Sequence, residues 1–289
     1  MKKLFAILLC ILLLAGCAET YDGPTETKQV LSEYEVRHYY SFFDWEAEQS
    51  ISRSTYAYDI YGNRVRELSY DNGELVQETR MKYDEQGREI SRTDIDREGW
   101  FPIIEGHNKR TYDEQGRVLS YSYHNGWGVE QSRSTYTYDD EANTMTWSNG
   151  EGDSIIYYYD ENGLHLRSVS DDGYETIYQY DDRGNRIGWT ATKDGVFWGS
   201  YEACFDEQSR LIWGTSYDER GVQSSHTTYT YDDEANTTTI TKSDGSVRYE
   251  YRDGDGRLYL IEDYTSEGEL SMVQQYFYRD IRVPANGEE

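Results

Sequence analysis

Cysteine is scarce in this chain of 289 residues, which contains three. Cys10 lies within an apolar run near the amino terminus, and Cys17 follows that run. We expect Cys10 to be removed with a signal peptide and Cys17 to carry lipid, which leaves Cys204 without an intrachain partner. A structural disulfide is therefore excluded, and we expect Cys204 to pack within a strand rather than to react.

Aliphatic side chains and positive charges are also in short supply. Hydrophobic residues make up 36% of the chain, against about 45–50% in ordinary globular domains. The 55 acidic residues outnumber the 28 basic ones, so the formal net charge is −27. A compact aliphatic core is therefore not expected. The negative field also disfavours binding to nucleic acid and to anionic lipid surfaces.

Tyrosine is what the chain has in abundance, with 30 copies. A tyrosine can bury its ring and leave its hydroxyl in water, and one buried ring stabilises the fold by about 2–3 kcal/mol at most. Rows of such rings can hold a sheet that contains little leucine or isoleucine. The charge alone would favour disorder, but periodic aromatic strands with matched turns argue against it.

One apolar run stands out, residues 4–14, and it follows Lys2 and Lys3. It is too short to span a membrane and is typical of a signal peptide. Leu14 to Cys17 resembles the bacterial lipobox, in which the cysteine is lipidated and becomes the first residue after cleavage. The resemblance implies an extracytoplasmic lipoprotein of the cell envelope, anchored to a membrane through Cys17. The alternative is an ordinary secretory peptide in which Cys17 is incidental.

A short motif recurs along the chain, as in residues 178–187, where two tyrosines precede an Asp and a Gly follows three residues after it. Two aromatics at i and i+2 share one face of a strand, and Asp-x-x-Gly suits a type I turn that closes a bulged hairpin. Successive copies are 21 to 29 residues apart, a period typical of repeat proteins. The copies are Tyr58-Asp59, Tyr83-Asp84, Tyr112-Asp113, Tyr138-Asp139, Tyr159-Asp160, Tyr180-Asp181, Phe205-Asp206 and Tyr231-Asp232.

Two of these copies, at Asp139 and Asp232, have a loop one residue longer, in which we expect Asn143 and Asn236 to take the left-handed conformation. A second class of turn lies between consecutive copies and carries an Asn-Gly or Asp-Gly pair in most cases, as at Asn72-Gly73. Strands joined by tight turns are antiparallel neighbours. We therefore predict an all-β fold, an elongated or coiled antiparallel meander of around 18 to 20 strands.

The repeated motif resembles the YD repeats of the Rhs and teneurin families, over roughly residues 50–280. The resemblance implies a strip of tandem β-hairpins, which in large family members closes into a shell around cargo. This chain is much shorter, and residues 279–289 leave no room for a toxin domain. We therefore do not carry over the shell and toxin functions.

The sequence divides into four segments. We predict a lipoprotein signal peptide at 1–16, the lipidated cysteine and a tether at 17–29, the repeat domain at 30–283 and an acidic tail at 284–289. Residues 30–58 are expected to form a degenerate first hairpin. A helix over 28–45 is the alternative, which the aromatic and β-branched residues there disfavour.

The longest step between copies, from Asp84 to Asp113, contains Pro102, which cannot donate to a central ladder. We predict a bulge, an edge or a protruding loop there, with Trp100, Phe101 and His107 as contact candidates. The alternative is that these aromatic residues cover one end of the sheet.

No arrangement of catalytic or metal-binding residues is apparent. The histidines are scattered, and the paired carboxylates lie in turns, where Asp is wanted for local backbone bonding. We therefore expect no enzyme activity, no cofactor and no zinc site. A glycan hydrolase would need two carboxylates facing each other across a cleft, and calcium at acidic turns is a minor alternative.

The remaining candidates are flat aromatic rings that could stack on sugars or peptides, or could instead cover the sheet itself. These rings belong to Trp127, Trp147, Trp189, Trp198 and Trp213. We therefore predict a non-enzymatic surface module that binds a glycan, a wall polymer or a protein. The alternative is a shielding or immunity-like accessory that sequesters a protein partner.

Overall fold

The computed structural model describes residues 25–38, 50–97 and 102–284, and every regular element in these ranges is a strand. Among these residues there is no helix with the length and apolar character needed to cross a membrane. The strands are β1 (Thr25–His38), β2 (Ser50–Tyr58), β3 (Arg64–Asp71), β4 (Glu74–Tyr83), β5 (Glu89–Asp96), β6 (Ile103–Tyr112), β7 (Val118–Asn125), β8 (Glu130–Asp139), β9 (Thr144–Asn149), β10 (Ser154–Tyr159), β11 (His165–Ser170), β12 (Tyr174–Tyr180), β13 (Arg186–Lys193), β14 (Val196–Phe205), β15 (Leu211–Tyr217), β16 (Gln223–Asp232), β17 (Thr237–Lys242), β18 (Val247–Arg252), β19 (Leu258–Tyr264) and β20 (Leu270–Pro284).

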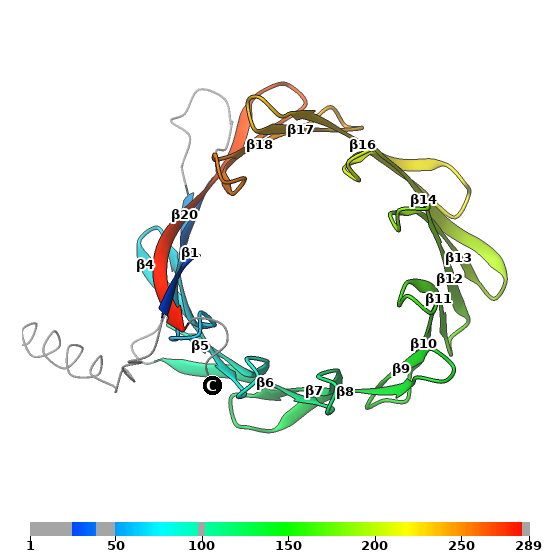
Figure 1. Cartoon of the computed structure of the whole chain (residues 1–289), viewed down its shortest axis with the longest axis horizontal. Helices are drawn as coiled ribbons and strands as arrows, with labels where there is room; N and C mark the ends of the chain where they lie inside the picture. Colours follow the sequence, from blue (N-terminus) through cyan, green and yellow to red (C-terminus); the bar gives the residue numbers. More distant parts are fainter. Residues whose placement is uncertain (1–24, 39–49, 98–101, 285–289) are drawn as a thin grey trace, which may run out of the picture.

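The strands form one closed antiparallel barrel (Figure 1). Each strand pairs with the next in the chain, and β1 also pairs with β20, with Val30 opposite Arg279 and Val36 opposite Gln274. The prediction of an antiparallel meander of hairpins is confirmed, but the prediction of an elongated or coiled strip is wrong. Pairing between the first and last strands leaves no free edge, and an exposed edge is a site for association with other chains.

The amino-terminal part of the barrel departs from two predictions. The predicted tether, 17–29, ends before Thr25, because residues 25–29 belong to β1 and Thr25 pairs with Pro284 of β20. Residues 28–38 are strand, so the helical alternative is wrong there. The signal peptide, Cys17, residues 39–49 and the end of the acidic tail lie outside the described residues.

The Asp-x-x-Gly turns form as the sequence predicts. In the turn at Asp84, the Gly87 N–H donates to the Asp84 carbonyl, and Asp84 Oδ1 accepts from the N–H groups of Gln86 and Arg88. Gly87 has φ +74°, a conformation that glycine adopts without steric cost. The longer turns are also confirmed, since Asn143 and Asn236 have φ of +51° and +52°.

The second class of turn follows the prediction in part. Asn72-Gly73 and Asp194-Gly195 form two-residue turns with both residues at positive φ, whereas at Asp172-Gly173 and Asp244-Gly245 only the glycine has positive φ. At 125–129, by contrast, it is Gly128 that has positive φ, and the Asn125 side chain accepts from Trp127 and Val129 as Asp does in the first class. The turn at 149–153 is built in the same way around Gly152. Asparagine can replace aspartate there because its side-chain oxygen accepts the N–H groups of the turn, and the Asn149 amide nitrogen also donates to Asp153 at 2.7 Å.

Consecutive strands alternate in direction, so the two classes of turn lie at opposite ends of the barrel. We call the end with the turns at 59–63, 84–88, 113–117, 139–143, 160–164, 181–185, 206–210, 232–236 and 253–257 the YD rim. The opposite end is the second-turn rim. In Figure 1 one set of hairpin ends curls toward the centre of the ring, while others, such as that between β13 and β14, splay outward.

Tyrosine hydroxyls connect neighbouring strands at the YD rim. Tyr112 donates to the carbonyl of Glu89, the first residue of β5, at 2.7 Å, and its ring lies under the Arg88 guanidinium at 4.6 Å. Arg88 in turn donates to Asp84 at 2.7 Å. The same hydroxyl-to-carbonyl bond recurs in Tyr58, Tyr83, Tyr138, Tyr180, Tyr231 and Tyr278. Each of these bonds except that of Tyr58, which reaches Leu31 within β1, links one repeat to the first residue of the strand that follows the previous YD turn.

Few side chains are fully buried in the described part of the barrel. The buried hydrophobic residues are Val30, Val36, Met81, Ile95, Ala203 and Ile261. Side chains can fill the interior of a barrel of about eight strands, whereas barrels of 16 or more strands enclose open space. A ring of 20 strands with so small a core is therefore a single layer of sheet around a hollow centre.

Candidate functional site

Exposed apolar side chains lie at the second-turn rim in two groups, one around the β7–β8 turn and one on β14 and the β15–β16 turn, with β9 to β13 between them. Trp127 is 92% exposed, and Ile103, Ile104 and Val129 beside it are each at least half exposed. We define the apolar rim surface as Ile103, Ile104, Trp127, Val129, Val196, Phe197, Trp198 and Val222. Other exposed apolar residues, such as Leu119 and Ile177, lie singly along strands, which is normal for protein surfaces.

Local turn geometry holds Trp127 outward. Its N–H donates to Asn125 Oδ1 at 3.0 Å, and the Gly128 N–H donates to the Asn125 carbonyl at 2.8 Å. Gly126 lies against the backbone of Ile104, and a Cβ at this position would meet the Ile104 carbonyl oxygen. The turn therefore packs directly on the start of β6, which brings Trp127 next to Ile103 and Ile104.

A stacked pair of histidines contacts this turn. His107 on β6 is opposite His124 on β7, and their rings stack with centroids 4.7 Å apart. His124 Nδ1 lies 3.4 Å from the Gly128 carbonyl, and its Nε2 lies 3.0 Å from Ser122 Oγ. Burial lowers the pKa of His107, and the charges of His124 and Lys109 lower it further. This environment therefore favours the uncharged form of His107.

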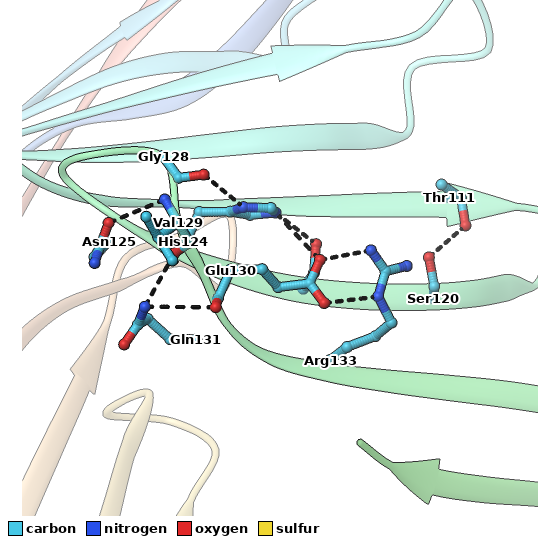
Figure 2. Close-up of polar contacts among 10 residues, drawn as sticks. Thr111, Ser120, His124, Asn125, Gly128, Val129, Glu130, Gln131 and Arg133 are labelled. Carbon is cyan, nitrogen blue, oxygen red and sulfur yellow. Dashed lines mark hydrogen bonds and ion pairs between the residues drawn. The ribbon is translucent and has the colours of Figure 1, made fainter. Parts of the chain in front are cut away.

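A fixed ion pair borders the same turn (Figure 2). Arg133 donates to both oxygens of Glu130, at 2.9 and 2.6 Å, and these hydrogen bonds lower the pKa of Glu130. Glu130 Oε2 also lies 3.9 Å from His124 Nε2. A hollow of about 370 Å³ lies alongside, between β8 and the turn that contains Asn149 and Glu151. The apolar side chains of this turn are therefore bordered by one negatively and one positively charged side chain.

The hairpin of β13 and β14 carries the second part of the apolar rim surface. Trp198 is about half exposed and meets the edge of the Tyr174 ring at 5.6 Å. The Lys193 ammonium lies 4.1 Å from the centre of the same ring and also contacts Asp172. Tyr174 on β12 therefore makes a cation–π interaction with Lys193 at this rim.

The tryptophans predicted from the sequence to bind a ligand fall into an exposed group and a partly buried group. Trp127 and Trp198 are exposed at the second-turn rim, and His107 lies beside the turn of Trp127. Trp147, Trp189 and Trp213 lie within strands and are partly buried, opposite Tyr136, Tyr178 and Cys204 respectively. Cys204 is free and partly buried. Trp100 and Phe101 lie outside the described residues, while Pro102 precedes β6 and is outside any strand.

One cluster was missed by the sequence reasoning. Glu78 on β4 is fully buried and accepts from Arg66 at 2.8 Å, from Arg80 at 2.6 Å and from Arg97. Burial raises the pKa of Glu78, but the three arginines lower it more, and the result is about 2. Arg66 and Arg80 alternate with acidic residues on neighbouring strands, and this pattern could have indicated the cluster. The register between these strands is needed, however, to predict which charges meet.

A larger hollow, of about 850 Å³, opens at the YD rim between the turns at Asp59 and Asp84, lined in part by Met81, Tyr83 and Ile90. The aspartates that border it are engaged in their own turns. Asp84, for instance, is bound to Arg88. Within the described ranges, no group of three His, Cys, Asp or Glu side chains is placed to hold a metal ion.

Comparison with known proteins gives matches among solved structures only. No family model and no curated protein matches the chain. The crystal structure of TcdB2-TccC3-TEV matches 84% of this chain and 19% of its own, at 12% identity and a TM-score of 0.28. The Tc holotoxin pore of Photorhabdus luminescens gives 11% identity, 86% and 19% coverage and a TM-score of 0.27. This chain therefore spans about a fifth of the length of those proteins.

A crystal structure of a porin-like protein from Bacteroides uniformis matches 86% of this chain and 96% of its own, at 12% identity and a TM-score of 0.33. The described residues of this chain form an all-β barrel of 20 antiparallel strands. Likenesses of this size carry no functional argument. Function has to be inferred from the barrel's own surfaces.

Proposed function

We propose that this protein is a lipid-anchored, extracytoplasmic YD-repeat module that binds a ligand without performing chemistry on it. The repeated Tyr-Asp-x-x-Gly motif supports the family, and the lipobox-like residues ending at Cys17 support the anchor. The ligand classes that suit exposed aromatic rings are a glycan, a wall polymer or a protein.

The observation that carries this proposal is the apolar rim surface. A tryptophan with 92% of its area in water contributes nothing to the stability of the barrel through burial. Tryptophan is also enriched among the residues that dominate binding energy at interfaces. Trp127 and Trp198 lie on hairpins whose backbones are fixed by hydrogen bonds. The conformational entropy lost when a ligand binds to these side chains is therefore small.

The carboxylates provide a second line of support, because most of those in the turns bind their own backbone. Asp84, Asp113 and Asp181 each accept from N–H groups of their turn and from the side chain of a following Arg or Asn. Carboxylates used in this way are held in the turns rather than facing each other across a cleft, as a hydrolase would need.

A second candidate function is favoured by the hollow ring. A barrel with open space at its centre could shield or sequester a partner as an immunity-like accessory. Under this function, ligand binding would depend on side chains that face the interior, and removal of the rim tryptophans would leave it unchanged.

Binding measurements with purified residues 18–289, which include every described strand, test the proposal. We expect a ligand from glycan panels or envelope extracts to bind about tenfold more weakly after Trp127→Ala or Trp198→Ala. Tyr61→Ala is the control, because the Tyr61 ring is also exposed, at 63%, but lies in a turn of the YD rim. Full binding by the double tryptophan variant, or no ligand in any panel, would count against a rim-binding module.

A further inference from the structure

The direction in which the barrel would stand on a membrane follows from where its first strand begins. β1 starts at Thr25, opposite Pro284, and ends at His38, opposite Ser50. Tyr278, which bonds to Leu258 at the YD rim, is opposite Leu31. Residues 25–30 and 279–284 therefore continue past the YD rim as a two-stranded ribbon. At about 3.3 Å per residue this ribbon projects by roughly 20 Å.

The length of chain before this ribbon limits the distance to an anchor. Cys17 precedes Thr25 by eight residues, which span about 29 Å at most. An anchor at Cys17, as the proposed function has it, therefore holds the ribbon and the YD rim toward the membrane. The second-turn rim lies on the opposite side, beyond strands of six to ten residues that add roughly 20–33 Å.

The charge around the apolar rim surface limits what can occupy it. Acidic side chains clearly outnumber basic ones in the second turns and at the strand ends that flank them. The acidic residues are Asp71, Glu74, Glu130, Glu151, Asp153, Asp171, Asp172, Asp194, Asp218, Glu219, Asp244, Glu267 and Glu269, and the basic ones are Arg97, Lys193, Arg220 and Lys242. Such a rim attracts cations and repels anionic polymers.

We propose that the second-turn rim faces away from the anchoring membrane and binds a cationic polypeptide segment that carries apolar side chains. Its apolar residues would pack on Trp127 and Val129, and its Lys or Arg side chains would meet the surrounding carboxylates. Lys193 over Tyr174 shows, within the chain itself, how an ammonium group is accommodated at this rim. Membrane lipid is not the occupant, because the rim points away from it.

Orientation is tested with the full lipidated chain in phosphatidylcholine vesicles. A donor dye is attached at Glu114→Cys on the YD rim or at Glu219→Cys on the second-turn rim, each with Cys204→Ser, and the acceptor dye is on lipid. We expect energy transfer to be about twofold more efficient from position 114, because the two rims are separated by the length of a strand. Greater transfer from position 219 would overturn the orientation. Failure of the chain to bind vesicles would instead refute the anchor of the proposed function.

The occupant is tested with three synthetic peptides on residues 18–289: alternating Lys-Phe, alternating Glu-Phe and alternating Lys-Ser. We expect the Lys-Phe peptide to bind about tenfold more tightly than either control, and to lose about fivefold of its affinity after Trp127→Ala but not after Tyr61→Ala. Equal binding of the Glu-Phe or Lys-Ser peptide would overturn the inference. A neutral glycan that binds through Trp127 while the Lys-Phe peptide does not would also overturn it, but would leave the proposed function intact.

Discussion

Glu78 carries a buried negative charge that three guanidinium groups compensate. Its side chain has no exposed area, whereas Arg66, Arg80 and Arg97 each keep part of theirs in water. A buried carboxylate without partners would become protonated, and here the hydrogen bonds keep its pKa at about 2. The cluster joins β3, β4 and the end of β5 across one face of the sheet.

The pH dependence of folding follows from this pKa. The pKa of Glu78 in the folded protein lies below the ordinary value of 4.5, so the stabilisation is complete above pH 4.5 and is lost as the pH falls toward 2. The difference corresponds to about 3 kcal/mol. Urea unfolding at a series of pH values measures it, and stability that stays constant across this window would refute the cluster.

Glu78→Gln should lower the free energy of unfolding by about 3 kcal/mol and flatten the pH dependence in the same window, because it leaves three cations without a counter-charge. Glu114→Gln is the matched control, since Glu114 is an exposed turn residue. Equal effects of the two substitutions would show that the burial of Glu78 is unimportant.

At the scale of the element, a tyrosine hydroxyl fastens most hairpins to the next, although Phe205 has no hydroxyl and Tyr251 bonds to Glu262 instead. The strand that follows a YD turn begins with a carbonyl that accepts this hydroxyl, as Glu89 does from Tyr112. In four copies the Asp–Arg pair of the turn also covers the ring of the next repeat, with Arg88, Arg117, Arg210 and Arg257 over Tyr112, Tyr138, Tyr231 and Tyr278. A repeat is therefore stable mainly in the presence of its neighbour.

Tyr112→Phe removes one such hydroxyl and keeps the ring under Arg88. We expect it to lower the free energy of unfolding by about 1 kcal/mol, because the Glu89 carbonyl loses its partner. Tyr61→Phe, at an exposed ring in a turn, should have no measurable effect. Chemical denaturation of the two variants side by side gives the comparison, and equal stabilities would exclude a structural role for the hydroxyl.

The sequence predicted the hairpins well because the groups that form a YD turn lie within five residues. Asp84, Gly87 and Arg88 need no distant partner to close their turn. The sequence could not separate Trp127 from Trp147, because exposure depends on whether the residue lies in a turn or opposite Tyr136 on a neighbouring strand. The stacking of His107 on His124 likewise depends on the register of β6 and β7, which the bulges shift.

At the scale of the whole molecule, closure of the barrel could not be predicted from local sequence patterns. It depends on the twist summed over 20 strands and on pairing between residues such as Val30 and Arg279, which are far apart in the sequence. The alternation of strand direction separates the two rims, and the even number of described strands places both described ends of the chain at the YD rim. Closure adds the β1–β20 ribbon that continues past this rim, so the proposed orientation depends on that pair.

A disulfide between β1 and β20 tests closure directly. Glu33 and Phe277 are opposite each other across this pair. In residues 18–289 with Cys204→Ser, Glu33→Cys combined with Phe277→Cys should oxidise to a monomeric cross-linked species, detected by mass after non-reducing digestion. The control combines Glu33→Cys with Ile177→Cys on β12, far around the ring, and should stay reduced. A closed barrel predicts cross-linking of the 33–277 pair alone, whereas an open strip predicts that neither pair forms a bond within one chain.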